Sequence, residues 1–198
     1  MRERITVDKL YNFDELSESA QDAAIESIGT MNQEYFDPAE LTYQFELALE
    51  EWGFPCDKNA IEWSLSYSQG DGVAFYGSIN LKTYLTKTKQ LTKFRPLLNN
   101  PDIYLEAFIG RNSYGSHYSH WNTMDVALDV SHDERELTPG EHALYELLQE
   151  SLEENVVEVS QELERMGYAE LEYISSREYI IEQIEINEWE FTADGKSA

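Results

Sequence analysis

The sequence predicts a single α+β domain spanning residues 1–198. A chain of 198 residues with 41% hydrophobic residues can form one domain with a sizeable core. Alternating apolar and polar residues between 60 and 81 predict a β-hairpin, and apolar residues three and four apart over 139–166 predict a long helix. We therefore expect a mostly antiparallel sheet of about four strands with helices packed on it.

Two helices are expected before the hairpin. The first begins near Asp14-Glu15-Leu16-Ser17, where acids in the first turn suit the helix dipole. The second covers residues 38–51, and Gly53-Phe54-Pro55 ends it.

The hairpin has the clearest β pattern in the chain. Apolar residues alternate with polar ones from Ile61 to Tyr67 and again from Val73 to Leu81, with Gly70-Asp71-Gly72 between them. Asp-Gly between alternating strands is typical of a tight turn, and we favour that over an active-site turn. Two more strands are expected at 103–109 and 124–130.

A long acidic helix is predicted over 139–166. Thr138 and Glu141 have capping-box spacing, and Gly167 stands where a helix would end. Glutamates recur at every fourth position, out of phase with the apolar residues, so we expect them to face water. These glutamates are Glu146, Glu150, Glu154, Glu158 and Glu162. We expect a strand at 169–174 and a short helix through about Ile184.

The net charge of −25 is the outlying property of the composition. Residues 1–80 carry −12 and residues 133–198 carry −15, whereas residues 81–110 carry +3. So few cations argue against direct binding of nucleic acid or of an anionic membrane, and a basic protein is the expected partner. The lysines of 82–98 are expected to balance an acidic block or to bind a small anion, with charge balancing favoured.

The expected location is the cytoplasm. Cys56 is the only cysteine, which suits a reducing compartment, and no signal-peptide core or membrane-length apolar run is present.

Catalytic motifs are lacking in the sequence. No nucleophile elbow or phosphate-binding loop occurs, so we expect no enzyme and no cofactor. His117 and His120 are weak metal-ligand candidates because no second paired motif supports them.

An aromatic stretch lies between the last two predicted strands. Tyr114, Tyr118 and Trp121 have small polar neighbours, a composition that suits protein recognition. The alternative is that Tyr118 and Trp121 pack over the sheet.

Three segments resemble small acidic proteins encoded by bacteriophages and prophages. They are Phe13-Asp14-Glu15-Leu16-Ser17, the stretch YSQGDGVAF at 67–75, and INEWEFTADGK at 186–196. The resemblance implies a phage protein made in a bacterial cytoplasm, and it supplies no functional residue.

Three hypotheses follow. The first is an anti-defence inhibitor that binds a host CRISPR or restriction protein with a DNA-mimicking row of helix glutamates, flanked by Glu153 and Glu182. The second is an acidic interaction module that uses the aromatic stretch from Tyr114 to Trp121. The third is a small metal-dependent enzyme centred on His117 and His120. The sequence specifies no oligomeric state.

Overall fold

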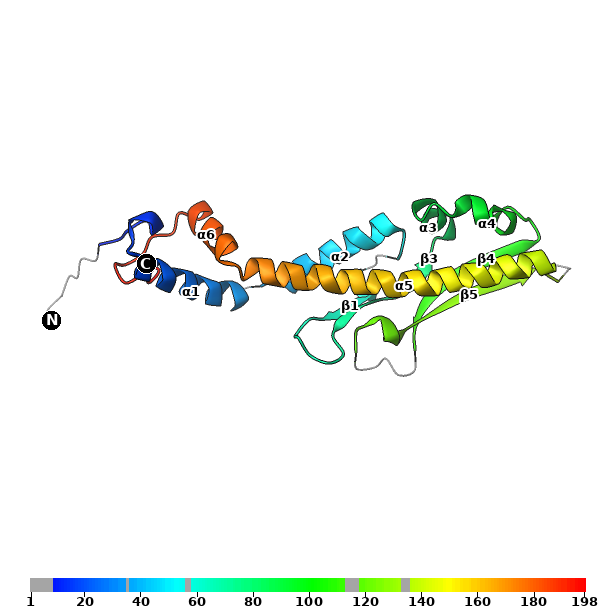
Figure 1. The fold of residues 1–198 in the computed structure, drawn as a ribbon, viewed down its shortest axis with the longest axis horizontal. Coiled ribbons are helices and arrows are strands. Elements are labelled where there is room, and N and C mark those ends of the chain that lie inside the picture. Colours follow the sequence, from blue (N-terminus) through cyan, green and yellow to red (C-terminus); the bar gives the residue numbers. More distant parts are fainter. Residues whose placement is uncertain (1–8, 35, 56–57, 113–117, 133–135) are drawn as a thin grey trace, which may run out of the picture. The chain divides into compact units, whose positions relative to one another are not determined.

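The computed structural model describes residues 9–34, 36–55, 58–112, 118–132 and 136–198 (Figure 1). This described part contains six α-helices and five β-strands, which confirms the α+β class. The strands form two antiparallel sheets rather than one sheet of about four strands, a pair β1-β2 and a triple β3-β4-β5. The chain divides into two compact units, residues 1–37 with 169–198 and residues 38–168. The single domain stays a prediction, and each unit is described by itself.

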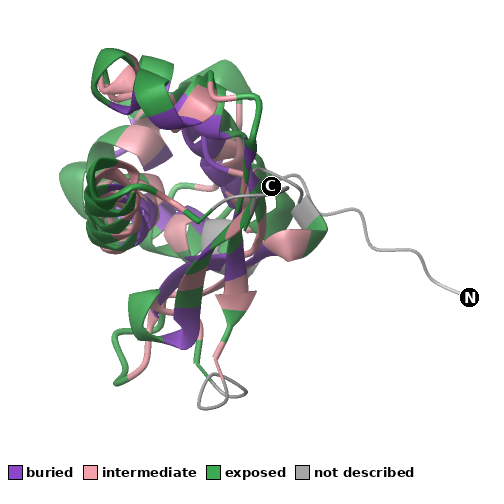
Figure 2. Cartoon of the chain, turned by 90° about the vertical axis from the view of Figure 1, so that its right-hand side faces the viewer, coloured by how far each residue is buried: buried purple, intermediate pink, exposed green. Residues whose placement is uncertain are grey.

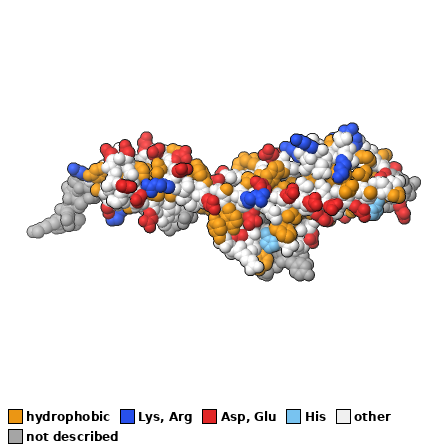
Figure 3. Space-filling model, viewed as in Figure 1, with side chains coloured by type: hydrophobic (Ala, Val, Ile, Leu, Met, Phe, Trp, Pro, Cys, Tyr) orange, Lys and Arg blue, Asp and Glu red, His pale blue; other side chains and the backbone are white. Residues whose placement is uncertain are grey.

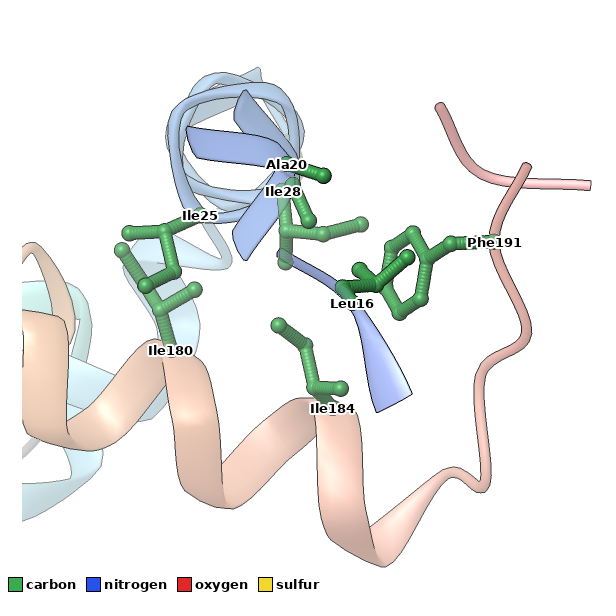
Figure 4. Packing of buried hydrophobic residues seen from close by; sticks show 8 residues of the cluster. Leu16, Ala20, Ile25, Ile28, Ile180, Ile184 and Phe191 are labelled. Atoms are coloured by element: carbon green, nitrogen blue, oxygen red, sulfur yellow. The ribbon is translucent and has the colours of Figure 1, made fainter. Parts of the chain in front are cut away.

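The first unit is built on helices α1 (Glu18–Glu34) and α6 (Arg177–Ile186). One face of each helix contributes to a hydrophobic cluster that Phe191 closes, as Figure 4 shows. Tyr11 and Phe191 pair their backbones in an antiparallel bridge. The cluster consists of Leu16, Ala20, Ala24, Ile25, Ile28, Ile180, Ile184 and Phe191.

The second unit begins with α2 (Pro38–Trp52), followed by the predicted hairpin. Strand β1 (Ile61–Ser64) pairs with β2 (Gly72–Phe75), so the hairpin is confirmed. Its second strand ends earlier than the alternation suggested. Gly77, with a φ of 133°, adopts a backbone angle that side chains disfavour, and the chain there enters β3 (Gly77–Ile79) of the other sheet.

The three-stranded sheet has β4 (Ile103–Arg111) at its centre, between β3 and β5 (Met124–His132). Both long strands were predicted, and each begins at its predicted residue and extends two residues beyond its predicted C-terminal end. Between β3 and β4 the basic segment forms two short helices, α3 (Leu81–Lys87) and α4 (Leu91–Leu98).

Helix α5 (Pro139–Ile174) is longer than the predicted 139–166. The capping box is present, since Thr138 Oγ1 accepts from the Glu141 amide at 3.3 Å and Glu141 Oε2 accepts from the Thr138 amide at 2.9 Å. Gly167 does not end the helix. It is buried, and a Cβ there would overlap Leu65 and approach Phe45 to 3.0 Å. The glycine therefore serves close packing, and the strand predicted at 169–174 is wrong because the helix continues through it.

The sheets and the helices of the second unit both contribute buried residues to its core, and Figure 2 colours the buried residues purple. Phe54 packs edge-on against Phe75 at 5.5 Å and against Tyr84 at 5.4 Å between ring centroids. Leu148, Leu152, Val156 and Leu163 form the buried stripe that the sequence predicted for α5.

Candidate partner-binding surfaces

The inner face of α5 fixes this helix against strand edges of the second unit. Ser160 Oγ donates to the carbonyl of Val73 in β2 at 2.5 Å. Tyr145 Oη donates to the carbonyl of Leu128 at 2.5 Å, and Gln149 Nε2 donates to that of Val126 at 2.9 Å, both in β5. Unpaired carbonyls of an edge strand otherwise attract other chains, so α5 both covers and satisfies these edges.

The outer face of α5 carries the predicted glutamates. Glu146, Glu150, Glu154 and Glu158 are exposed, and Glu162 is half-buried. Four residues make slightly more than one turn, so each step moves the next side chain about 40° around the axis. The row therefore crosses the outer face diagonally, from one flank of the buried stripe to the other. Figure 3 shows acidic side chains along this helix.

The glutamates at the two ends of this row lie close to a basic side chain, whereas those in the middle form no ion pair with a described residue. Glu146 lies 3.4 Å from His142, and Glu162 forms an ion pair with Arg165. Glu150, Glu154 and Glu158 form no ion pair with any described residue. Their carboxylates are open to a partner.

The C-terminal end of the row lines a groove of about 630 Å³. Glu158 and Glu162 form one wall of this groove, with Arg165 beside them, and Trp52 from α2 and Lys87 from α3 lie along the other side. The row thus ends at a groove of mixed charge.

The flanking glutamates have different positions. Glu153 is exposed on α5 and accepts from Gln149 Nε2 at 2.5 Å. Glu182 is exposed on α6, so it belongs to the first unit, and its carboxylate lies 3.4 Å from Tyr173 Oη. The negative charge of Glu182 is the main cause that raises the pKa of Tyr173. The structure therefore places Glu153 beside the row and Glu182 in a separate unit.

The aromatic stretch is described only in part, because Tyr114 and His117 lie outside the described residues. Tyr118 is 50% exposed and stacks on His120 at 5.8 Å between ring centroids. Trp121 is 40% exposed and lines a second groove of about 450 Å³, whose wall also contains Glu153. The structure thus brings together one residue of the predicted aromatic site and one of the predicted acidic site.

Asp71, at the hairpin turn, is enclosed by hydrogen-bond donors. Its Oδ2 accepts from the Ser66 amide at 2.6 Å, from the Ser68 amide at 2.8 Å and from Tyr168 Oη at 2.7 Å. Oδ1 accepts from the Ser64 hydroxyl at 2.9 Å. The turn is therefore organised around one carboxylate, which supports the structural interpretation of Gly70-Asp71-Gly72.

The pKa values of Asp71 and Tyr168 move in opposite directions from their ordinary values. Desolvation raises the pKa of Asp71, but the hydrogen bonds from Ser68, Tyr168, Ser66 and Ser64 outweigh it and hold that pKa well below its usual range. Desolvation, followed by the hydrogen bond to Asp71, raises the pKa of Tyr168 to about 12. Asp71 stays ionised and Tyr168 stays protonated, which is the arrangement that maintains the bond.

Two tyrosines near this turn, Tyr67 and Tyr168, were not predicted as site residues. Tyr67 is 72% exposed, and its ring centroid lies 4.6 Å from that of Tyr168 on α5. Tyr118 lies against the same turn, because a Cβ at Gly70 would overlap its ring. The alternation from Ile61 to Tyr67 was the available signal, but it indicated a strand and could not show exposure.

The weak metal-ligand candidates His117 and His120 cannot be compared as a pair, because His117 lies outside the described residues. No group of three or more His, Cys, Asp and Glu side chains suited to a metal ion occurs among them. His120 Nδ1 accepts from the Asn122 amide at 3.1 Å. In the part of the chain that the structure describes, no helix is both long and apolar enough to span a membrane.

These features define an α+β protein with an acidic helix face and exposed aromatic side chains beside a rigid turn. The chain belongs to the family described as Domain of unknown function (DUF8835), whose model matches residues 31–179. No curated protein and no solved structure matches the chain.

Proposed function

We propose that the protein is a phage-encoded inhibitor of a host defence protein that acts on nucleic acid, of the CRISPR or restriction type. The outer face of α5 binds the partner's basic groove and excludes the nucleic acid. The protein then acts in the bacterial cytoplasm, as a binding protein and not as an enzyme, and requires no cofactor.

The observation that carries this proposal is the run of exposed glutamates on α5. Neighbouring members lie about 6 Å apart along the axis, a spacing of the same order as that of phosphates along a strand. Glutamates four apart repel each other by a few tenths of a kcal/mol, and no lysine relieves them between Phe94 and Gly195. The repulsion within the row destabilises the helix, and the glutamates remain exposed. Such a row is suited to bind a cationic partner.

A competition experiment tests the proposal. Labelled duplex DNA is bound to purified restriction and RNA-guided nucleases, and its displacement by the protein is followed by fluorescence anisotropy at increasing salt. We expect displacement from a susceptible nuclease to weaken steeply with salt. The double variant Glu150→Lys/Glu154→Lys should no longer displace the DNA.

The matched control carries the same charge change elsewhere. Glu26 and Glu185 are exposed in the first unit, so Glu26→Lys/Glu185→Lys alters the net charge equally and leaves α5 intact. This control should still displace the DNA. Displacement that survives the α5 changes, or that both variants lose equally, would contradict a site on α5.

A second candidate function is protein recognition by the exposed aromatics of the turn region. Tyr67, Tyr118 and Trp121 are each at least 40% exposed, and Tyr67 and Tyr118 lie against a turn that Asp71 makes rigid. Rigid, amphipathic aromatic side chains are typical anchors of interfaces. If they form the site, Tyr118→Ala or Trp121→Ala weakens partner binding, and salt has little effect on the affinity.

A further inference from the structure

Four basic side chains of helices α3 and α4, together with Lys89 between the two helices, form a patch that the proposed function does not use. We call them the α3–α4 basic patch. Figure 3 shows basic side chains gathered over these helices. No aspartate or glutamate occurs between positions 72 and 101, although the chain has 39 acidic residues. The patch consists of Lys82, Lys87, Lys89, Lys93 and Arg95, all exposed.

The patch is not neutralised by the acidic groups of the described chain. None of its five cations forms an ion pair with a described residue. By contrast, Arg111, Arg165 and Arg177 pair with Glu62, Glu162 and Asp22. Direct ion pairing among the described residues therefore does not explain why these cations are clustered.

Lys89 of the patch occupies a backbone position that favours glycine. It follows the end of α3 with a φ of 59°, in the left-handed region, and the next amide, that of Gln90, donates to the Leu85 carbonyl at 2.8 Å. Glycine is the residue most often found at this position after a helix, because it has no Cβ. A lysine adopts the same backbone at a cost in stability, so glycine would fit this position better and leave the patch with one cation fewer.

The surroundings of the patch limit the kind of anion that it can accept. Lys87 shares the 630 Å³ groove with Glu158 and Glu162 of α5. A nucleic-acid duplex carries about one charge per 1.7 Å of its axis, so phosphates beyond the patch would meet these carboxylates. A short acidic peptide segment can place its charges on the patch alone.

We propose that the α3–α4 basic patch binds an acidic segment of a partner protein. This inference does not rest on the proposed function, because it uses different residues and the opposite charge. It adds a second interaction surface, and a partner that contacts both surfaces must present acidic and basic groups side by side, which fixes its orientation.

The test measures binding of a fluorescent poly-glutamate peptide to the full chain, with a duplex oligonucleotide long enough to extend beyond the patch as a second probe. We expect saturable, salt-sensitive binding of the peptide in preference to the oligonucleotide. The variant Lys87→Glu/Lys93→Glu should weaken peptide binding on the order of tenfold, because two contacts become repulsions. Glu150→Lys/Glu154→Lys keeps the patch, so it should not weaken peptide binding.

A second variant separates binding from folding. Lys89→Gly should weaken peptide binding while raising the melting temperature, a combination that simple damage to the fold cannot produce. Peptide binding that resists the charge reversals, no saturable peptide binding at low salt, or preferential binding of the oligonucleotide would each overturn the proposal. Because the α5 variant still binds the peptide while losing DNA displacement, failure of one proposal is distinguishable from failure of the other.

Discussion

The two faces of α5 differ in whether their polar side chains are bonded to the rest of the second unit. On the inner face, Ser160 and Tyr145 each donate a hydrogen bond to the carbonyl of a strand residue. On the outer face, Glu150 and Glu154 are exposed without an ion pair to any described residue. The inner groups hold the second unit together, whereas the outer ones repel each other and leave the helix open to a partner.

Removing the carboxylate that Tyr168 contacts should give the largest effect. Asp71→Ala leaves two amides, the Ser64 hydroxyl and Tyr168 Oη without their acceptor, and hydrogen bonds to charged groups contribute strongly. We expect a loss of about 3 kcal/mol in the free energy of unfolding, measured by denaturant titration. Glu154→Ala is the control, with a change within about 0.5 kcal/mol. Equal losses of unfolding free energy in Asp71→Ala and Glu154→Ala would show that the hydrogen-bonded carboxylate contributes no more to stability than the exposed one.

The contribution of Asp71 should also depend on pH. Its folded-state pKa lies well below the ordinary value of 3.8, so the ionised form stabilises the native state. That stabilisation is complete above about pH 4 and is lost as the pH falls through the folded-state pKa. The difference in unfolding free energy between the wild type and Asp71→Asn should therefore shrink in acid, which unfolding curves at successive pH values can measure. A constant difference would show that ionisation of Asp71 is not the cause.

The two glycines of α5 offer the next comparison. Gly167→Ala places a methyl group against Leu65 and Phe45, and overpacking of this kind costs about 2 kcal/mol. At Gly140 nothing lies within 4 Å, so Gly140→Ala should stabilise the helix by up to about 1 kcal/mol. Thermal unfolding of both variants measures the contrast. A destabilised Gly140→Ala with an unchanged Gly167→Ala would reverse our assignment of the faces.

Loss of one inner-face hydrogen bond should have a smaller effect. Ser160→Ala removes the donor to the Val73 carbonyl, and a buried acceptor left without a partner costs about 1.5 kcal/mol. Hydrogen exchange of the β1-β2 amides, together with denaturant unfolding, should show the loss. Ser151→Ala provides a control because the Ser151 hydroxyl contacts only the half-buried Gln90 side chain. Its effect should be the smaller of the two.

The outer face should show the smallest effect, and with the opposite sign. Glu154→Lys places a cation four residues from both Glu150 and Glu158, which replaces two repulsions by two attractions. We expect a gain of a few tenths of a kcal/mol in unfolding free energy, diminishing at high salt. A loss of stability in this variant would mean that Glu154 has a structural role.

Local sequence patterns predicted the elements that depend on neighbours in the chain. The capping box at Thr138 marked the start of α5, and the alternation from Ile61 onward marked the hairpin. The apolar stripe of α5 was also correct, since Leu148, Leu152 and Val156 are buried. Capping and periodicity act over a few residues, so the sequence expresses them directly.

The candidate surfaces were predicted less completely. Exposure of the α5 glutamates followed from helical phase, whereas the ion pair of Glu162, the groove beside Glu158 and the enclosure of Asp71 did not. The exposed Tyr67 escaped notice because alternation identifies a strand without showing what covers it. Each of these features depends on residues far apart in the sequence.

The sequence by itself determined the α+β class, the hairpin, the long amphipathic helix and the separation of acidic from basic segments. Tertiary structure decided the role of Gly167. A glycine at such a position commonly ends a helix, but in this fold its missing Cβ allows Leu65 and Phe45 to pack against the helix. It also divided the strands between two sheets and left the cations of α3 and α4 without an ion pair to any described residue. The physical reason is one of range, because capping and periodicity operate within a turn or two of backbone, whereas packing and ion pairing depend on which distant segments meet.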